Sequence, residues 1–189
     1  MMDFFKTVLG LLRFEKGPDA FPSSVPLLIL SLALFALTSF GQTRFTENLD
    51  NAVGTALVTT GILVAFVLAV MGMAGLVSRL IQTMTTFAIA GTAINLFAIL
   101  SFTILYFAPV PLLEMGITSP IKVPMIIFGF LLTYTILRRA LAKSGLVCFA
   151  LTVVYFLLIV QFTAPFTSDP QMQRERPRPE AGVGQKQLE

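Results

Sequence analysis

Neutral polar side chains gather in one otherwise apolar stretch of this 189-residue chain, SRLIQTMTTFAIAGTAINLF. Their amides and hydroxyls can exchange hydrogen bonds with another helix or with a bound molecule. Steps of three, four and seven residues put Gln82, Thr85, Thr86, Thr92 and Asn95 near one helical face. We expect this face to point at other helices, either as hydrogen-bonded packing or as part of a lipid or substrate cavity. The candidate packing or cavity residues are Arg79, Gln82, Thr83, Thr86, Gly91, Thr92 and Asn95.

Several other kinds of chemistry lack the side chains they need. The chain has no histidine, which excludes Ser-His and Cys-His nucleophile pairs, histidine-ligated zinc or haem, and imidazole proton relays. The single cysteine, Cys148, lies inside an apolar run with no second cysteine to pair with, so we interpret it as a packing residue. Neither Lys122 nor Lys143 has an evident catalytic partner. We therefore expect no enzymatic activity, no cofactor and no metal site.

Carboxylates are absent from the apolar runs. Every Asp and Glu falls in a connection, a terminus or an interfacial segment, and Glu114 comes nearest to the membrane. Ion-coupled transporters usually keep such a group within a span. Proton-coupled transport is therefore disfavoured, whereas a passive or lipid-related role is not.

The elements that must position the polar face are long apolar segments. Hydrophobic residues make up 56% of the chain and charged residues 12%, a balance typical of membrane proteins. A spanning helix needs about 20 mostly apolar residues. Five candidate spans cover residues 22–40, 52–77, 80–107, 123–137 and 146–164. Because lipid requires every backbone polar group to be satisfied internally, we expect an all-α polytopic transmembrane bundle.

The fourth span is the weakest of the five. It is short, between Lys122 and Arg138, although both of these side chains can snorkel toward the interface. If it lies flat, the count falls to four spans. The preceding residues 108–124 contain Pro109, Pro111, Pro120 and Pro124, a density that predicts an extended connection and no regular helix.

Basic residues near the span ends predict the orientation, since they are retained on the cytoplasmic side. Arg44 and Lys122 fall in the short connections on the opposite side. With the amino terminus cytoplasmic, five spans put the carboxyl tail outside, which in a bacterial inner membrane is the periplasm. The basic residues on the amino-terminal side are Lys6, Arg13, Lys16, Arg79, Arg138, Arg139 and Lys143.

Two terminal segments differ from the spans. Residues 1–21 begin with MMDFFKTVLGLLRF, whose apolar side chains form one helical stripe, so we expect an amphipathic interfacial helix. Docking of a partner is the alternative for this helix. Residues 165–189 are rich in Pro, Gln, Arg and Glu, which predicts a disordered polar tail. Its RERPRPE stretch is short and charge-balanced, so we expect no nucleic-acid binding.

Small residues recur in the second span and its carboxyl end. Gly61, Ala65 and Ala69 follow one another at intervals of four, and Gly54 and Gly72 extend the series. Such spacing lets two helices approach closely in lipid. We expect it to serve packing within the chain, with a homodimer face as the alternative.

The overall layout resembles the Yip1-domain superfamily of small five-span membrane proteins. The sequence RLIQTMTTFAIAGTAINL is similar to uncharacterised bacterial relatives in which an Arg precedes a Gln-Thr pair and a Gly-Thr step, here Arg79, Gln82, Thr83, Gly91 and Thr92. For eukaryotic members the resemblance implies membrane trafficking through small GTPases. For bacterial members it implies almost nothing about mechanism.

Two functional hypotheses follow from this sequence. The first is an accessory or scaffold protein that interacts with the lipid bilayer, with other membrane proteins or with itself. The second is a small oligomeric transporter, channel or lipid-handling protein with a cavity near Asn95. A leucine at that position separates them, because it should abolish ligand binding under the second hypothesis and chiefly lower stability if the amide only holds helices together.

Overall fold

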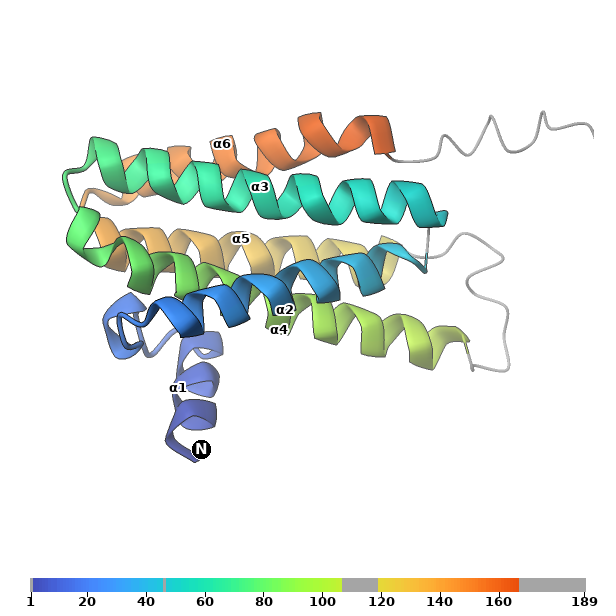
Figure 1. The fold of residues 1–189 in the computed structure, drawn as a ribbon, viewed down its shortest axis with the longest axis horizontal. Helices are drawn as coiled ribbons and strands as arrows, with labels where there is room; N and C mark the ends of the chain where they lie inside the picture. The colour runs from blue at the N-terminus through green and yellow to red at the C-terminus, as the bar shows by residue number, and fades with distance from the viewer. Residues whose placement is uncertain (1, 46, 107–118, 167–189) are drawn as a thin grey trace, which may run out of the picture.

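The computed structural model describes residues 2–45, 47–106 and 119–166, and these contain helices and no strand (Figure 1). The all-α prediction is confirmed. The α-helices are α1 (Met2–Leu12), α2 (Val25–Thr43), α3 (Leu49–Met73), α4 (Leu80–Tyr106), α5 (Ser119–Leu141) and α6 (Gly145–Thr163). Three short 3₁₀ helices join or end them, namely η1 (Pro18–Ala20), η2 (Val77–Arg79) and η3 (Ala164–Phe166).

Five segments are long and apolar enough to cross a membrane, as the sequence predicts, so the chain is an integral membrane protein. These segments are Val25–Thr43, Leu49–Met73, Val77–Ile104, Val123–Leu141 and Gly145–Phe166.

The second span lies a few residues earlier than predicted. The side chain of Asn48 accepts a hydrogen bond from the backbone N–H of Asn51 at 2.9 Å, which caps the start of α3. At the other end Gly75 adopts φ +69°, and the N–H of Leu76 donates to the carbonyl of Met71 at 3.0 Å. This is a glycine-terminated helix end, and it stops α3 before the predicted boundary at residue 77.

The prediction of an extended connection through Pro124 is wrong for residues 119–124. Helix α5 begins at Ser119 and includes Pro120 and Pro124. Pro120 lies in the first turn, where proline is tolerated because the N–H that it lacks has no partner within the helix. Pro124 lies one turn further on, inside the helix, where the missing N–H removes one backbone hydrogen bond. The fourth span begins at Val123, as predicted, but extends to Leu141 and not only to residue 137. The helix that contains it begins earlier, at Ser119. The rest of the proline-rich connection, residues 107–118, lies outside the described residues, as does the predicted disordered tail from residue 167 onward.

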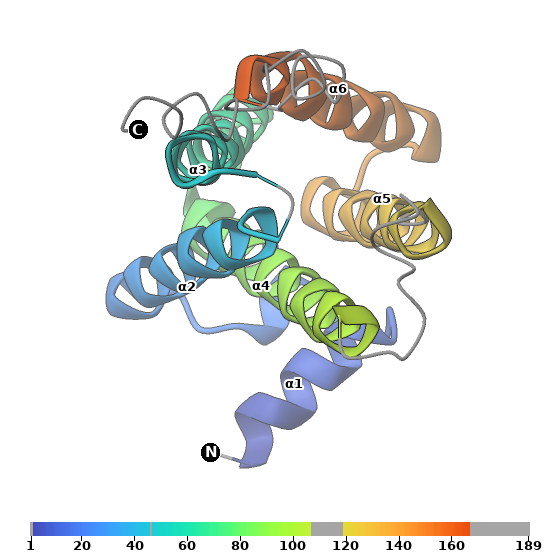
Figure 2. The same ribbon diagram turned by 90° about the vertical axis from the view of Figure 1, so that its right-hand side faces the viewer.

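The spanning helices form a closed ring when the bundle is seen from its end (Figure 2). Around the ring α2 contacts α3, α3 contacts α6, α6 contacts α5, α5 contacts α4, and α4 returns to α2. Because α4 packs most extensively on α2 and also contacts α3, its stretch from residue 83 to 90 is buried all round. The polar stretch of the sequence therefore lies on the most enclosed helix.

Helix α1 runs across the long axis of the bundle, near the end where α2 begins (Figure 1). The carboxyl-terminal half of its apolar stripe faces the bundle, with Leu11 only 1% exposed and Val8 and Leu12 packed against the core. The side chain of Arg139 donates a hydrogen bond to the carbonyl of Phe14. Gln82 Nε2 donates to the carbonyl of Phe21 at 3.1 Å. Residues from α4 and α5 thus hold the amino-terminal segment against the bundle.

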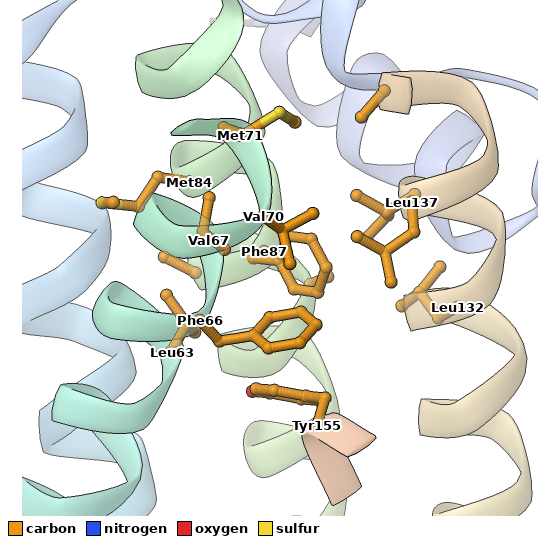
Figure 3. Packing of buried hydrophobic residues seen from close by; sticks show 14 of the residues in the cluster. Leu63, Phe66, Val67, Val70, Met71, Met84, Phe87, Leu132, Leu137 and Tyr155 are labelled. Atoms are coloured by element: carbon orange, nitrogen blue, oxygen red, sulfur yellow. The ribbon is translucent and has the colours of Figure 1, made fainter. Parts of the chain in front are cut away.

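Large apolar side chains fill the half of the bundle nearest α1. Figure 3 shows Phe66 and Val70 of α3 and Phe87 of α4 extending toward Leu132 and Leu137 of α5. All five side chains are at most 6% exposed. This packed core closes the interior of the ring at that end.

Candidate functional site

A cavity of about 360 Å³ lies between the five spanning helices, and it is partly open to the outside. This volume is within the range of small-molecule binding sites in proteins. Every helix of the ring contributes to its wall. The lining includes Phe35 and Gln42 of α2, Thr59 and Leu63 of α3, Phe87, Gly91, Asn95 and Phe102 of α4, Met125, Gly129 and Thr133 of α5, and Tyr155 and Phe156 of α6.

The cavity is elongated along the bundle. Its wall runs along α4 from Phe87 to Phe102, which corresponds to about 22 Å at the helical rise per residue. Phe87 and Leu132 belong both to this wall and to the packed core, so they form its floor. From there the cavity extends toward the end of the bundle where α2 ends and α5 begins. The shape suits an extended hydrocarbon chain better than a compact ligand.

Two hydroxyl groups in the wall have no hydrogen-bond partner in the described part of the chain. They belong to Thr133 on α5 and Tyr155 on α6, whose residues are 7% and 6% exposed. The residues are buried, but their hydroxyl oxygens are not among the fully buried side-chain atoms, so they remain accessible to a small molecule. Figure 3 shows the Tyr155 ring beneath that of Phe66, and the two ring centroids lie 4.9 Å apart. The hydroxyls of Thr133 and Tyr155 can therefore form hydrogen bonds with a molecule in the cavity.

Asn95 also lines the cavity, as the sequence hypothesis of a cavity near this residue requires. Its Nδ2 donates to Thr38 Oγ1 on α2 at 3.4 Å, a long contact at the edge of hydrogen-bond range. Its carbonyl oxygen is an additional acceptor. Asn95 therefore combines the two roles proposed from the sequence, since it links α4 to α2 and presents a polar group to the cavity.

Gly91 is the second candidate residue in the cavity wall, and it also marks a close helix contact. A Cβ atom built on Gly91 would lie 2.4 Å from Cε2 of Phe35 on α2. Glycine is therefore required for α4 to approach α2 this closely.

The remaining candidates lie away from the cavity. Arg79 is exposed at the end of η2, and its carbonyl accepts from the Thr83 hydroxyl at 2.9 Å. The hydroxyls of Thr86 and Thr92 likewise donate to carbonyls of α4 itself, those of Gln82 and Ala88. The threonine hydroxyls at these three positions thus bond within their own helix and not across the bundle, which is common in apolar surroundings.

The small-residue series of α3 packs within the chain only in part. Gly54 lies against the ring of Phe166, where an added Cβ would come within 2.4 Å of Cδ1. Nothing in the described residues lies within 4 Å of a Cβ added at Gly61 or Gly72. The expected packing within the chain is thus absent at these two positions.

Sequence reasoning missed most of the polar lining. Thr133 and Tyr155 are isolated polar residues in two different apolar runs, so no local pattern marks them. Only their place in the ring brings them together with Asn95. One signal could have identified them, because a hydroxyl inside a span needs a hydrogen-bond partner. Neither residue has an acidic or amide side chain one helical turn away, so that partner must come from another helix or from a bound molecule.

The chemistry of the cavity is neutral. Its walls carry hydroxyl and amide groups among apolar side chains, and none of its lining residues is charged. Within residues 2–45, 47–106 and 119–166, no three His, Cys, Asp or Glu side chains cluster so as to hold a metal ion. Cys148 is fully buried in the core, as predicted. No family model, curated protein or solved structure matches this chain.

Proposed function

We propose that this membrane protein binds a neutral, largely apolar molecule in the cavity enclosed by its five spanning helices. The observation that carries the proposal is that Thr133 and Tyr155, two largely buried residues, line a 360 Å³ cavity with hydroxyls that have no hydrogen-bond partner in the described part of the chain. Apolar surface would supply most of the affinity, and the hydroxyls and Asn95 would fix the orientation. The function is lipid handling in the broad sense.

The packed core supports binding over conduction. A channel through one chain needs a continuous path, whereas Phe66, Val70 and Phe87 fill the ring at the α1 end. The polar groups of the wall are also few and scattered over five helices, whereas an ion needs a ring of oxygens to replace its hydration shell. The proposal is thus a cavity with one closed end.

Purification in a mild detergent, followed by mass spectrometry of the intact protein and of its organic extract, tests the proposal. We expect a bound molecule with a long hydrocarbon part and no net charge in its cavity-bound portion. Asn95→Leu should reduce the amount retained by about tenfold, since one hydrogen bond lost in an apolar site is worth about 1.5 kcal/mol.

Thr38→Val is the matched control for this substitution. It removes the hydroxyl that Asn95 donates to, but Thr38 does not line the cavity. Both variants should lose a similar, small amount of stability, about 0.6 kcal/mol for one interhelical hydrogen bond in a membrane. Only Asn95→Leu should lose the ligand. Equal retention by both variants would assign Asn95 to packing alone and remove it from the site.

An accessory or scaffold role is our second proposal, and the open positions at Gly61 and Gly72 favour it. Both glycines lie on an outward face of α3, where a second helix in the bilayer can approach. Gly61→Leu should then abolish a stoichiometric partner or homo-oligomer in a mild-detergent pull-down and leave the monomer folded. If the complexes are unchanged by Gly61→Leu, this face is not the contact surface.

We further propose a bacterial inner membrane location with the α1 end in the cytoplasm, and membership of the Yip1-like group. The basic residues Arg79, Arg138 and Arg139 support the orientation, because all three lie at the α1 end of the bundle. A cysteine introduced at Ser144, with Cys148→Ala to remove the native thiol, should react with an impermeant reagent only from the cytoplasmic side.

A further inference from the structure

A second hollow lies on the outside of the bundle between α4 and α5. It has a volume of about 570 Å³. We call it the α4–α5 groove, and its walls are Ala93, Ile94, Phe97 and Ser101 of α4, Pro124, Met125 and Phe128 of α5, and Leu12 of α1.

The groove presents mainly hydrocarbon to its surroundings. Phe97 is 61% exposed, and Phe128 also reaches the surface. Its one hydroxyl, on Ser101, already donates to the carbonyl of Phe97 at 2.8 Å. In a spanning helix such a surface faces the acyl chains of the bilayer, so an acyl chain is the molecule available to enter the groove.

The groove and the central cavity share two wall residues, Ile94 and Met125. Across from Ile94, α5 carries Gly129, whose added Cβ would lie 3.6 Å from Ile94 Cδ1. The partition between the two spaces therefore consists of the ends of two flexible aliphatic side chains and a glycine. Rotamer changes of such side chains take place within nanoseconds on exposed surfaces, and methionine adapts readily to new packing.

We infer that the ligand of the central cavity is a lipid of the surrounding bilayer, and that its chain passes sideways between α4 and α5 past Ile94 and Met125. This inference rests on the proposed function, because it supplies the ligand class and the route for that same cavity. The groove takes up the hydrocarbon, and the polar groups at Asn95, Thr133 and Tyr155 bind the first neutral oxygen-bearing group that follows it inside.

The test uses the full chain in vesicles of phosphatidylethanolamine and phosphatidylglycerol that contain a phosphatidylcholine with a photoreactive group near the end of one acyl chain. After illumination, mass spectrometry locates the labelled peptides. Tyr155 lines the cavity but not the groove, so label on its peptide reports a chain inside the ring. Label at Phe97 reports a chain in the groove.

Ala93→Phe fills the groove without touching the cavity, because Ala93 lines only the former. Ala150→Phe is the matched control, since Ala150 is an exposed alanine of α6 that lines neither space. We expect Ala93→Phe to reduce the initial rate of labelling at Tyr155 at least tenfold and Ala150→Phe to leave it unchanged. An unchanged rate in Ala93→Phe would overturn the lateral route.

Met125→Ala gives a result of the opposite sign, and an unchanged melting temperature shows that the bundle has stayed folded. It thins the partition, so labelling at Tyr155 should become several times faster. A rate equal to or below that of the unchanged chain would also overturn the route.

A separate measurement distinguishes failure of the route from failure of the cavity. In detergent without lipid, the small probe 1-hexanol should raise the melting temperature of the unchanged chain, and Thr133→Phe, which fills the cavity, should abolish that rise. If the hexanol effect is present and Tyr155 is never labelled from the bilayer, the cavity binds ligands but the inference of a bilayer lipid is wrong. If both are absent, the proposed function fails as well.

Discussion

Two glycines in neighbouring helices should respond to the same substitution in opposite ways. Gly91 of α4 and Gly129 of α5 both lie in helix interiors and both line the cavity. Replacing either with alanine brings the same intrinsic gain in helix stability, about 1 kcal/mol. The difference between the variants therefore reports only what the added methyl group meets.

At Gly91 the methyl group meets a buried ring. Its Cβ would lie 2.4 Å from Cε2 and 2.7 Å from Cδ2 of Phe35, which is 5% exposed. To reach an ordinary contact of about 3.4 Å or more, the ring or the helix must move by about 1 Å, and overpacking of this kind costs about 1–3 kcal/mol. We expect Gly91→Ala to destabilise the protein by about 1 kcal/mol net.

At Gly129 the methyl group meets ordinary contacts. Its Cβ would lie 3.6 Å from Ile94 Cδ1 and 3.7 Å from Phe156 Cζ. Nothing has to move, so Gly129→Ala should stabilise the protein by about 0.5–1 kcal/mol. The two variants should thus differ by roughly 2 kcal/mol.

Unfolding of the purified protein in mixed micelles, by titration with a denaturing detergent, measures both free energies. Phe35→Leu in the Gly91→Ala background removes the obstructing ring, so its cost should be smaller than in the unchanged chain, and the double-mutant cycle gives the coupling. If Gly91→Ala proved as stable as Gly129→Ala, the close approach of α4 to α2 through this glycine would be refuted.

Three further predictions concern other parts of the bundle. Thr85→Val should raise stability by about 1 kcal/mol, because the hydroxyl of Thr85 is fully buried without a hydrogen-bond partner in the described residues; a loss of stability in a melting experiment would reveal a partner. Asn48→Ala should cost about 1 kcal/mol and speed amide hydrogen exchange in the first turn of α3, since it deletes the cap that accepts from Asn51; unchanged exchange there would refute the role of the cap. Arg139→Met should increase amide hydrogen exchange across residues 2–16 with little change in melting temperature, because it breaks the hydrogen bond to the Phe14 carbonyl. Arg138→Met, on the neighbouring exposed residue, should change neither quantity, and equal behaviour of the two variants would contradict the anchoring of α1 by Arg139.

The spans could be predicted because a membrane span depends on the length and composition of its own segment. A segment without charges and of sufficient length must be helical in lipid, whatever its neighbours are, and this reasoning found all five. The error at residues 119–124 came from counting prolines without regard to position. Pro120 lies in the first turn of α5, where proline costs little, and α5 continues through Pro124 although that residue lacks the N–H of a regular helical hydrogen bond.

The sequence predicted residues of the cavity wall only within its conspicuous polar stretch. Asn95 and Gly91 stand in a conspicuous polar stretch, and both line the cavity. The threonines of the same stretch do not, because a threonine can satisfy its hydroxyl on its own helix and periodicity cannot tell which will do so. Gln82 donates a hydrogen bond to the backbone carbonyl of Phe21. The spacing of side-chain types in a sequence cannot identify a backbone partner of this kind.

The order of the helices around the ring has a consequence for biogenesis. Helices α2, α3 and α4 are synthesised first and pack on one another, but the ring closes only when α6 reaches both α3 and α5. Until then the cavity that Asn95 lines lacks its α6 wall, formed by Tyr155, Phe156 and Ile159. An interruption of synthesis after α5 therefore leaves a half-open bundle with an intramembrane amide in an incomplete cavity, the kind of polar group in lipid that membrane quality control has to distinguish from a finished protein.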